Sequence, residues 1–252
     1  MNKKIYIFIG IVIVVALITK AWSWLNDIPP SQTVTGKQEE NPGEEKPLPV
    51  TNDWRLALLD SVNIKSENDI KQSVNEHFER FNLNRKTGEV TPVESATKRF
   101  NWPLDLTKKP YDAPPSAQNI HIRHLPEILP FWRLAGSDIL IVPVVAKGKY
   151  GLSAGFVAID SPGKTIAGVR FYHSEDTPGM GQDVLMADFG SRFVGKHLFD
   201  KNGSFALRIV QPEKTGKTTF DVDGISGATI TSSGIQAALE FWFSKEAYAS
   251  LL

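Results

Sequence analysis

The 252-residue sequence contains no cysteine. Disulfide bonds, thiolate nucleophiles, cysteine-ligated zinc and thiolate-held iron–sulfur clusters are therefore excluded within the chain. The chain also has no net charge, because 28 Lys and Arg residues balance 28 Asp and Glu residues. Without a global field of one sign we expect no nucleic acid as partner. The 41% of hydrophobic residues suits one main core with additional segments.

Several site signatures are missing as well. The glycines of "GMGQDV" (179–184) have the wrong spacing and place for the dinucleotide fingerprint that opens a βαβ unit. The five histidines form no recognisable catalytic triad pattern. His121 and His124 are three residues apart but have no carboxylate or third histidine at ligand spacing. We therefore expect no NADH site, no metal site and no complete catalytic site.

The N-terminal segment is long and apolar. After "MNKK" come "IYIFIGIVIVVALIT" (5–19), Lys20 and "AWSWL" (21–25). If Lys20 snorkels and the two tryptophans lie among the headgroups, residues 5–25 reach the roughly 20 residues of a spanning helix. A cleaved secretory signal is the alternative, but "KAWSWL" lacks a small-residue cleavage pattern. We predict that residues 1–25 are a cytoplasmic N-terminus and a transmembrane helix of a bacterial inner membrane, with a periplasmic main domain.

The next segment, residues 26–52, is rich in Pro and Glu and poor in large apolar side chains. Such a composition cannot bury enough surface to offset its ordering entropy. It predicts an extended linker, with a folded domain over residues 53–252.

Within that domain, apolar spacing predicts an amphipathic helix that starts near Ser66 and carries Ile70, Val74, His77, Phe78 and Phe81 on one stripe. Three strand-like runs follow at 138–146, 151–160 and 164–173, and their connections are short enough for hairpins. The pattern predicts an α+β fold with a twisted antiparallel sheet flanked by helices.

The remaining segments are predicted from weaker signals. Residues 85–130 are Pro-rich and suggest a long wrapping loop or a family-specific insertion. Residues 183–194 suggest a helix and residues 204–210 a strand. A C-terminal helix is expected to begin after Ser233, which forms a capping box with Gln236.

The stretch "DGISGATITSSG" (223–234) directly precedes this helix and consists largely of glycines and hydroxyl-bearing residues. Turn glycines and helix-capping serines explain part of it. They leave Asp223, Ser226, Ala228 and Thr229 without a reason. A nucleophilic Ser226 or Thr229 lacks a recognisable base.

"DGISGATITSSGIQ" resembles the flavinylation motif of the NqrC subunits of sodium-translocating NADH:quinone reductases. More broadly, it is similar to the Asp-Gly-x-(Ser/Thr)-Gly-Ala-Thr pattern of FMN-binding domains, which include the RnfG subunits of Rnf complexes. Further likeness lies in "NLNRKTGEV" (82–90), "IHIRHLPEILPFWRL" (120–134) and "VGKHLFDKNG" (194–203). The resemblance implies that a flavin transferase joins FMN through its phosphate to Thr229.

A second stretch, "YHSEDTPGMGQD" (172–183), resembles the family's His-x-Glu-Thr-Pro-Gly-Leu-Gly loop, which approaches the flavin ring. It departs from that pattern at Ser174, Asp176 and Met180. The family's Gly-Lys-Gly-Leu-Trp turn is "AKGKYG" (146–151) here, where Tyr150 offers a ring in place of Trp. The resemblance assigns FMN to Thr229, Asp223, Gly224, Ser226, Gly227, Ala228, Thr231, Asp176, Thr177, Gly179, Met180 and Gly181.

By the same resemblance, the chain is an electron-carrier subunit with covalent FMN in a membrane complex that passes electrons from NADH to quinone and exports sodium. Its partners would be the other membrane subunits, the flavin transferase and, through the N-terminal helix, membrane lipid. Two alternatives remain at this point: another membrane-anchored FMN carrier, of the Rnf type or stand-alone, and a flavin-free exported scaffold domain.

Overall fold

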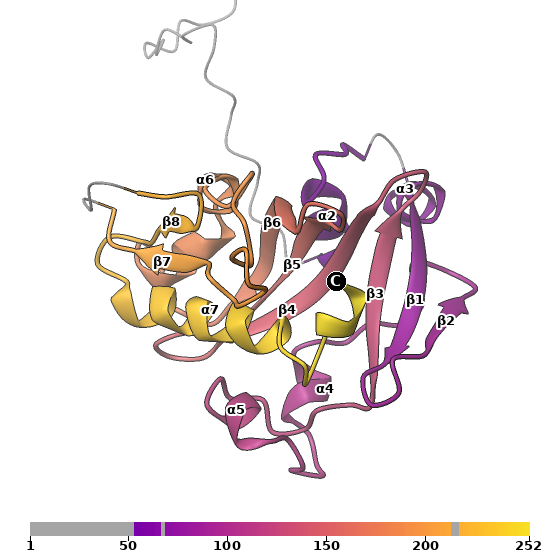
Figure 1. Cartoon of the computed structure of the whole chain (residues 1–252), viewed down its shortest axis with the longest axis horizontal. Coiled ribbons are helices and arrows are strands. Elements are labelled where there is room, and N and C mark those ends of the chain that lie inside the picture. Colours follow the sequence, from indigo (N-terminus) through magenta and orange to yellow (C-terminus); the bar gives the residue numbers. More distant parts are fainter. Residues whose placement is uncertain (1–52, 67–68, 213–216) are drawn as a thin grey trace, which may run out of the picture. The chain divides into compact units, whose positions relative to one another are not determined.

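The computed structural model describes residues 53–66, 69–212 and 217–252 (Figure 1). The predicted transmembrane helix and linker lie outside these residues. Within the described ranges, no helix has the length and apolar character needed to cross a bilayer.

The centre of the fold is a six-stranded sheet in the order β2-β1-β3-β4-β5-β6. All its neighbouring strands pair antiparallel, so the predicted α+β fold and the meander of three hairpin-linked strands are confirmed. The strands are β1 Phe78–Asn84, β2 Val90–Val93, β3 Ile128–Leu134, β4 Ile139–Lys147, β5 Leu152–Asp160 and β6 Thr165–Ser174. Strands β4 and β5 are buried almost throughout because both of their faces are covered.

The C-terminal segment fills the gap where β3 and β4 diverge. These two strands pair only at Trp132–Ile141 and Arg133–Leu140. The Trp242 indole N–H donates to the carbonyl of Val145 on β4 across 2.9 Å, and the Tyr248 hydroxyl donates to that of Pro130 on β3 across 2.8 Å. These two bonds tie the C-terminal segment to both strands inside the core.

The helices are short except for the last one. They are α2 Trp54–Asp60, α3 Ile70–His77, α4 Leu104–Thr107, α5 Pro115–Gln118, α6 Ala187–Ser191 and α7 Thr229–Trp242, with 3₁₀ turns η1 Gly181–Leu185 and η2 Ala249–Leu251. Helix α7 packs along β4, whereas α2 packs on β5 and β6 (Figure 1). A separate parallel pair, β7 Arg208–Val210 and β8 Asp221–Asp223, lies beside α7.

The predicted helix over residues 66–81 is wrong in both of its ends. The N-cap is Asp69, whose carboxylate accepts from the backbone N–H groups of Lys71 and Gln72. The helix ends at His77, and Phe78 begins β1, which pairs along its whole length with β3. Phe78 and Phe81 have helical spacing, but the seven residue pairs between β1 and β3 decide the structure of this segment. Tertiary pairing here outweighs a local sequence pattern.

Three other predictions also need correction. Residues 85–130 contain β2, α4, α5 and the start of β3. The expected helix over 183–194 is split into η1 and α6, because Met186 adopts an extended backbone between them. The strand expected over 204–210 is limited to β7.

Helix α7 begins five residues earlier than the capping pattern predicts. Its first residue is Thr229 and its N-cap is Ala228. Ser233 therefore lies inside the helix, and Gln236 does not complete a capping box. Its side chain instead accepts from the Ile209 N–H at 2.6 Å and donates to the Leu207 carbonyl at 2.7 Å. These two bonds fix α7 against β7.

Candidate functional site

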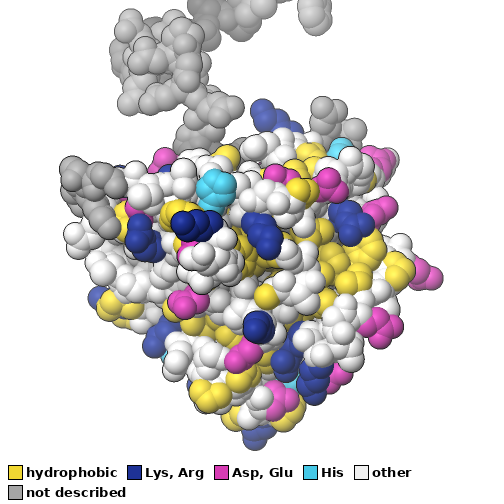
Figure 2. Space-filling model, viewed as in Figure 1, with side chains coloured by type: hydrophobic (Ala, Val, Ile, Leu, Met, Phe, Trp, Pro, Cys, Tyr) yellow, Lys and Arg dark blue, Asp and Glu magenta, His cyan; other side chains and the backbone are white. Residues whose placement is uncertain are grey.

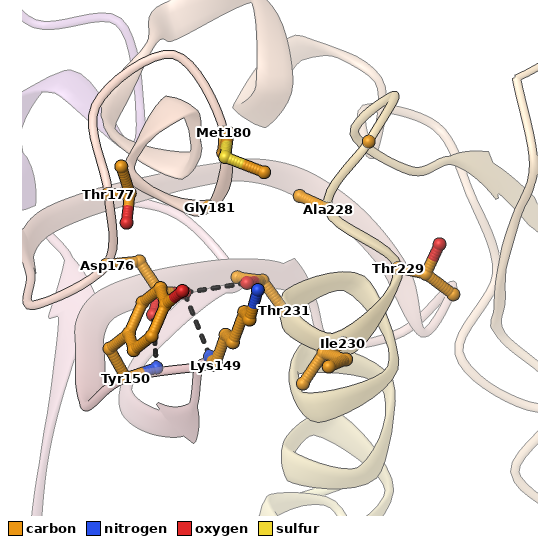
Figure 3. A pocket seen from close by; sticks show the side chains of 11 residues that line it. Lys149, Tyr150, Asp176, Thr177, Met180, Gly181, Ala228, Thr229, Ile230 and Thr231 are labelled. Atoms are coloured by element: carbon orange, nitrogen blue, oxygen red, sulfur yellow. Dashed lines mark hydrogen bonds between the residues drawn. The ribbon is translucent and has the colours of Figure 1, made fainter.

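A cavity of about 230 Å³ lies where three segments meet: the β4–β5 turn, the loop after β6 and the first turn of α7 (Figure 3). Two of these segments are the ones singled out by their sequence. The cavity is lined by Lys149, Tyr150, Asp176, Thr177, Met180, Gly181, Gly227, Ala228, Thr229, Ile230 and Thr231.

The Asp176 carboxylate joins all three segments. It is 5% exposed, and it accepts from the backbone N–H groups of Lys149 at 3.2 Å and Tyr150 at 2.8 Å. It also accepts from the Thr231 hydroxyl at 2.6 Å (Figure 3). Buried carboxylates need such donors, and bonds to a charged acceptor are among the stronger ones in proteins. Asp176 therefore sets the shape of the cavity.

Two glycines allow these segments to approach one another. A Cβ on Gly181 would lie 2.3 Å from Asp176 Oδ2 and 2.5 Å from Thr231 Oγ1. A Cβ on Gly234 in α7 would lie 1.7 Å from the carbonyl oxygen of Lys147. Only a residue without a side chain fits at either position, so helix α7 sits directly on the end of β4.

Large apolar side chains at the cavity remain open to solvent. Tyr150 is 66% exposed, Ile230 56% and Met180 40%. The ammonium of Lys149 lies 5.0 Å from the centroid of the Tyr150 ring. Exposed apolar side chains gathered at one cavity are typical of a ligand-binding or interaction site.

A second cavity, of about 250 Å³, lies on the other side of Thr229. Gly227 and Thr229 line both cavities. The rest of its lining comes from β7 and the two residues after it, from the loop before α7 and from α7 itself, namely Ile209, Val210, Gln211, Pro212, Gly224, Ile225, Ser226, Ser232 and Ser233. Thr229 thus stands on the boundary between a partly apolar cavity and a polar one.

The hydroxyl groups of "DGISGATITSSG" differ in their surroundings. Thr231 and Ser232 are buried; Thr231 donates to Asp176, and Ser232 Oγ accepts from the Ile225 N–H at 3.1 Å. Ser226, Thr229 and Ser233 are exposed. Only these three hydroxyls of the stretch are open to a modifying enzyme.

Thr229 has a further distinction, because it is the first residue of a 14-residue helix. The first N–H groups of a helix have no acceptor within it, and the N-cap Ala228 offers no side-chain acceptor. The first turn contains no acidic residue. The partial positive charge of this helix end is therefore available to an anion beside Thr229.

The loop before Thr229 is held by its own bonds. Gly227 has a φ of +74°, which favours glycine. Arg192, just after α6, donates through Nη1 to the Gly224 carbonyl at 2.7 Å, and its Nε donates to Asp188 at 3.1 Å. The guanidinium of Arg208 on β7 lowers the pKa of the Asp221 carboxyl on β8 to about 2. The Arg192 bonds thus connect the loop to α6, and the Arg208–Asp221 pair joins β7 to β8, the strand that leads into the loop.

The residues assigned to FMN by the sequence are largely brought together. Eight line the first cavity, namely Asp176, Thr177, Met180, Gly181, Gly227, Ala228, Thr229 and Thr231, and Gly224 and Ser226 line the second. Gly179 and Asp223 line neither cavity. Asp223 forms an ion pair with Lys217.

The sequence does not identify Lys149, Ile230 and Arg192 as site residues, and it marks Tyr150 only as an aromatic ring in place of Trp. "AKGKYG" departs from the family's turn, so its spacing did not identify Lys149. Ile230 looks like an ordinary helix residue in the sequence, and Arg192 acts from a segment without any motif. Within the described ranges, no group of three His, Asp or Glu side chains could hold a metal ion.

Residues 148–244 match the FMN-binding domain family. The chain is 28% identical over 188 residues, 73% of its length, to 71% of the NqrC subunit of the Na⁺-translocating NADH-quinone reductase from Yersinia pestis. It is 36% identical over 120 residues to the same subunit from Vibrio anguillarum, and this alignment covers 47% of each protein. The chain thus matches less than half the length of the Vibrio relative.

The fold is similar to a solved structure, the crystal structure of NqrC from Shewanella oneidensis. The TM-score is 0.68 at 25% sequence identity, with 78% of this chain and 93% of that chain covered. The resemblance to NqrC and to FMN-binding domains that the motifs indicated is confirmed by these matches.

Proposed function

Because the chain is a relative of NqrC, a subunit of the Na⁺-translocating NADH-quinone reductase, and carries an FMN-binding domain, we propose that it is an electron-carrier subunit. It holds FMN, covalently at Thr229, in a membrane complex that passes electrons from NADH to quinone and exports sodium. The observation that carries this proposal is the position of Thr229, exposed on the first turn of α7 between the two cavities.

The residues present fit such a group. A phosphodiester on Thr229 keeps one negative charge, which the N-terminal end of α7 favours. Each cavity is smaller than the roughly 300–1,000 Å³ typical of small-molecule sites. A flavin ring would therefore fill one cavity and stay partly open to solvent. The first cavity is the better candidate, because its exposed Tyr150, Met180 and Ile230 offer apolar surface for an aromatic ring.

When bound, FMN supplies one- and two-electron transfer. The chain's own residues position it. Asp176 holds the β4–β5 turn, the 176–181 loop and α7 in one arrangement. Thr177 is exposed at the cavity, where its hydroxyl can donate to a ring carbonyl or nitrogen. Gly181 would let the backbone come close to the ring, and the exposed rim of the cavity would leave one edge of the ring open for electron transfer.

The attachment chemistry does not need a base in this chain. A flavin transferase would bring FMN as a phosphoanhydride. The Thr229 Oγ1–phosphorus bond would form as the anhydride bond breaks, the second phosphate would leave with the rest of the donor, and the hydroxyl proton would pass to the transferase. The predicted partners follow from this assignment: the transferase, the other membrane subunits, and membrane lipid through the helix predicted within residues 1–25.

Intact mass of the full chain tests the proposal. After co-expression with a flavin transferase, we expect the wild-type chain to gain one FMN minus water, and Thr229→Ala to gain nothing. Ser233→Ala is the matched control, since Ser233 is an exposed hydroxyl one helical turn away and lines the second cavity. An unmodified wild-type chain under these conditions would refute covalent attachment and favour a flavin-free scaffold.

A further inference from the structure

A third cavity, of about 540 Å³, lies at the opposite end of the sheet from the candidate flavin site. It is formed by the end of α3, by β1 and by the chain from β2 to Ala96. Its lining includes Asn75, Phe78, Arg80, Phe81, Pro92 and Glu94. Nothing in the proposed flavin function uses this cavity. Figure 2 shows charged side chains of both signs over this side of the molecule.

Arg80 is the unusual residue of its lining. Its side chain lies on the buried face of β1, and the residue is only 8% exposed. The guanidinium lies 5.0 Å from the centroid of the Trp132 ring, and Nη1 donates to the Lys98 carbonyl. Nε is buried and has no hydrogen-bond partner. Most of the five N–H donors of this side chain are therefore not used by the protein.

No carboxylate pairs with Arg80 in the part of the chain that the structure describes. A buried cation without a counter-ion is unfavourable, because desolvation is not compensated. Burial accordingly lowers the pKa of Arg80 from its ordinary value. The buried Arg170, by contrast, has Asp60 beside it at 3.4 Å. Arg80 lacks the acidic partner that the fold provides for Arg170.

We propose that Arg80 is the anchor of a carboxylate-binding site in this cavity. A planar guanidinium can bind a carboxylate through two parallel N–H bonds, and the Trp132 ring packs beside the guanidinium of Arg80. Glu79 and Glu94 also line the cavity. Their charges disfavour a dianion such as phosphate, so a single carboxylate is the better fit. The carboxylate comes from a free organic acid or from an acidic side chain of a neighbouring protein in the complex.

Binding is measured on the purified full chain by tryptophan fluorescence and by the melting midpoint, because the anion would bind beside Trp132. The probes are sodium acetate and the blocked amino acid acetyl-glutamate amide. Potassium chloride at equal ionic strength and acetyl-glutamine amide are the controls. We expect a saturable fluorescence change and a higher midpoint with the carboxylates only.

Three variants test the role of Arg80. Arg80→Met should weaken carboxylate binding at least about tenfold, and Arg80→Lys, which keeps the charge but not the fork, should weaken it less. Arg123→Met is the matched control and should bind as wild type does, since Arg123 is exposed, lies over the Tyr111 ring and does not line this cavity. If Arg80→Met fails to fold, the comparison of Arg80→Lys with Arg123→Met decides.

The two sources give different results. Tighter binding of acetyl-glutamate amide than of acetate indicates an acidic side chain of a partner, and equal or weaker binding indicates a free organic acid. The proposal is overturned if neither carboxylate differs from its neutral or chloride control, or if Arg80→Lys and Arg80→Met both bind as the wild type does.

Discussion

The hydroxyl of Thr231 donates a 2.6 Å hydrogen bond to the carboxylate of Asp176, 55 residues earlier in the chain. This bond joins the first turn of α7 to the loop after β6. Both groups are buried, and the same carboxylate accepts two backbone N–H groups of the β4–β5 turn. The position of Thr229, two residues before Thr231, therefore depends on Asp176.

Thr231→Val should destabilise the fold by about 1–3 kcal/mol, because it removes a donor from a buried charged acceptor without changing the side-chain volume much. Thr229→Val, at an exposed position two residues away, should stay within about 0.5 kcal/mol of wild type. Denaturant unfolding measures both. Equal stability of the two variants would show that the bond to Asp176 contributes nothing.

Gly234→Ala should destabilise the chain although alanine is normally better than glycine in a helix by about 1 kcal/mol. The new Cβ would lie 1.7 Å from the Lys147 carbonyl oxygen, so α7 has to move away from β4. We expect the free energy of unfolding to fall by about 1–3 kcal/mol. Thermal unfolding measures it, with Ser233→Ala at the adjacent exposed position as control. A stabilised Gly234→Ala variant would contradict the close packing of α7 on β4.

Arg192→Met should slow flavin attachment, because Arg192 holds the Gly224 carbonyl and so positions the loop that precedes Thr229. We expect the rate of FMN incorporation to fall about tenfold, which corresponds to ~1.4 kcal/mol, while attachment still goes to completion. The time course of the mass gain measures it. Lys201→Met, an exposed change distant in sequence from the motif, is the control and should keep the wild-type rate. An unchanged rate of FMN incorporation in Arg192→Met would show that Arg192 does not position the loop for attachment.

The lowered pKa of Asp221 should make the stability of the fold sensitive to acid. This pKa falls from an ordinary value of about 3.9 to about 2, chiefly through the hydrogen bond from Arg208. Because the folded state binds this proton less tightly than the unfolded state, Asp221 stabilises the fold above pH ~4, and this stabilisation is lost as the pH falls toward ~2. Melting midpoints of the wild type and Asp221→Asn should therefore differ most above pH ~4 and converge near pH ~2. A constant difference across this range would contradict the shifted pKa.

The sequence predicted the parts of the fold that rest on local patterns. The three central strands have strong apolar runs and short turns, so the predicted ends of β4, β5 and β6 lie within one residue of the observed ends. Phe78 and Phe81, which fit a helical stripe, were predicted as helix but lie in β1. The pairing of β1 with β3 depends on residues about 50 positions away, which no local pattern records.

The candidate site likewise has a part that local motifs predict and a part that depends on tertiary contacts. Motifs located Thr229 and the 176–181 loop, and most of their residues line one cavity or the other. The capping box of Ser233 and Gln236 gave the wrong helix start, because Gln236 instead bonds to the backbone of β7 and the residue before it. Tertiary contacts such as this one, and that of Arg192, have no signature in a single sequence.

The bond between Thr229 and FMN is tested most directly by mapping the modified residue in a tryptic peptide. Trypsin cleavage after Lys217 and Lys245 gives a peptide that carries every hydroxyl of the motif. Fragmentation of this peptide from the full chain, co-expressed with a flavin transferase, should place the mass of FMN minus water on Thr229 alone. The same mass on Ser226 or Ser233, or a peptide without added mass, would contradict the account.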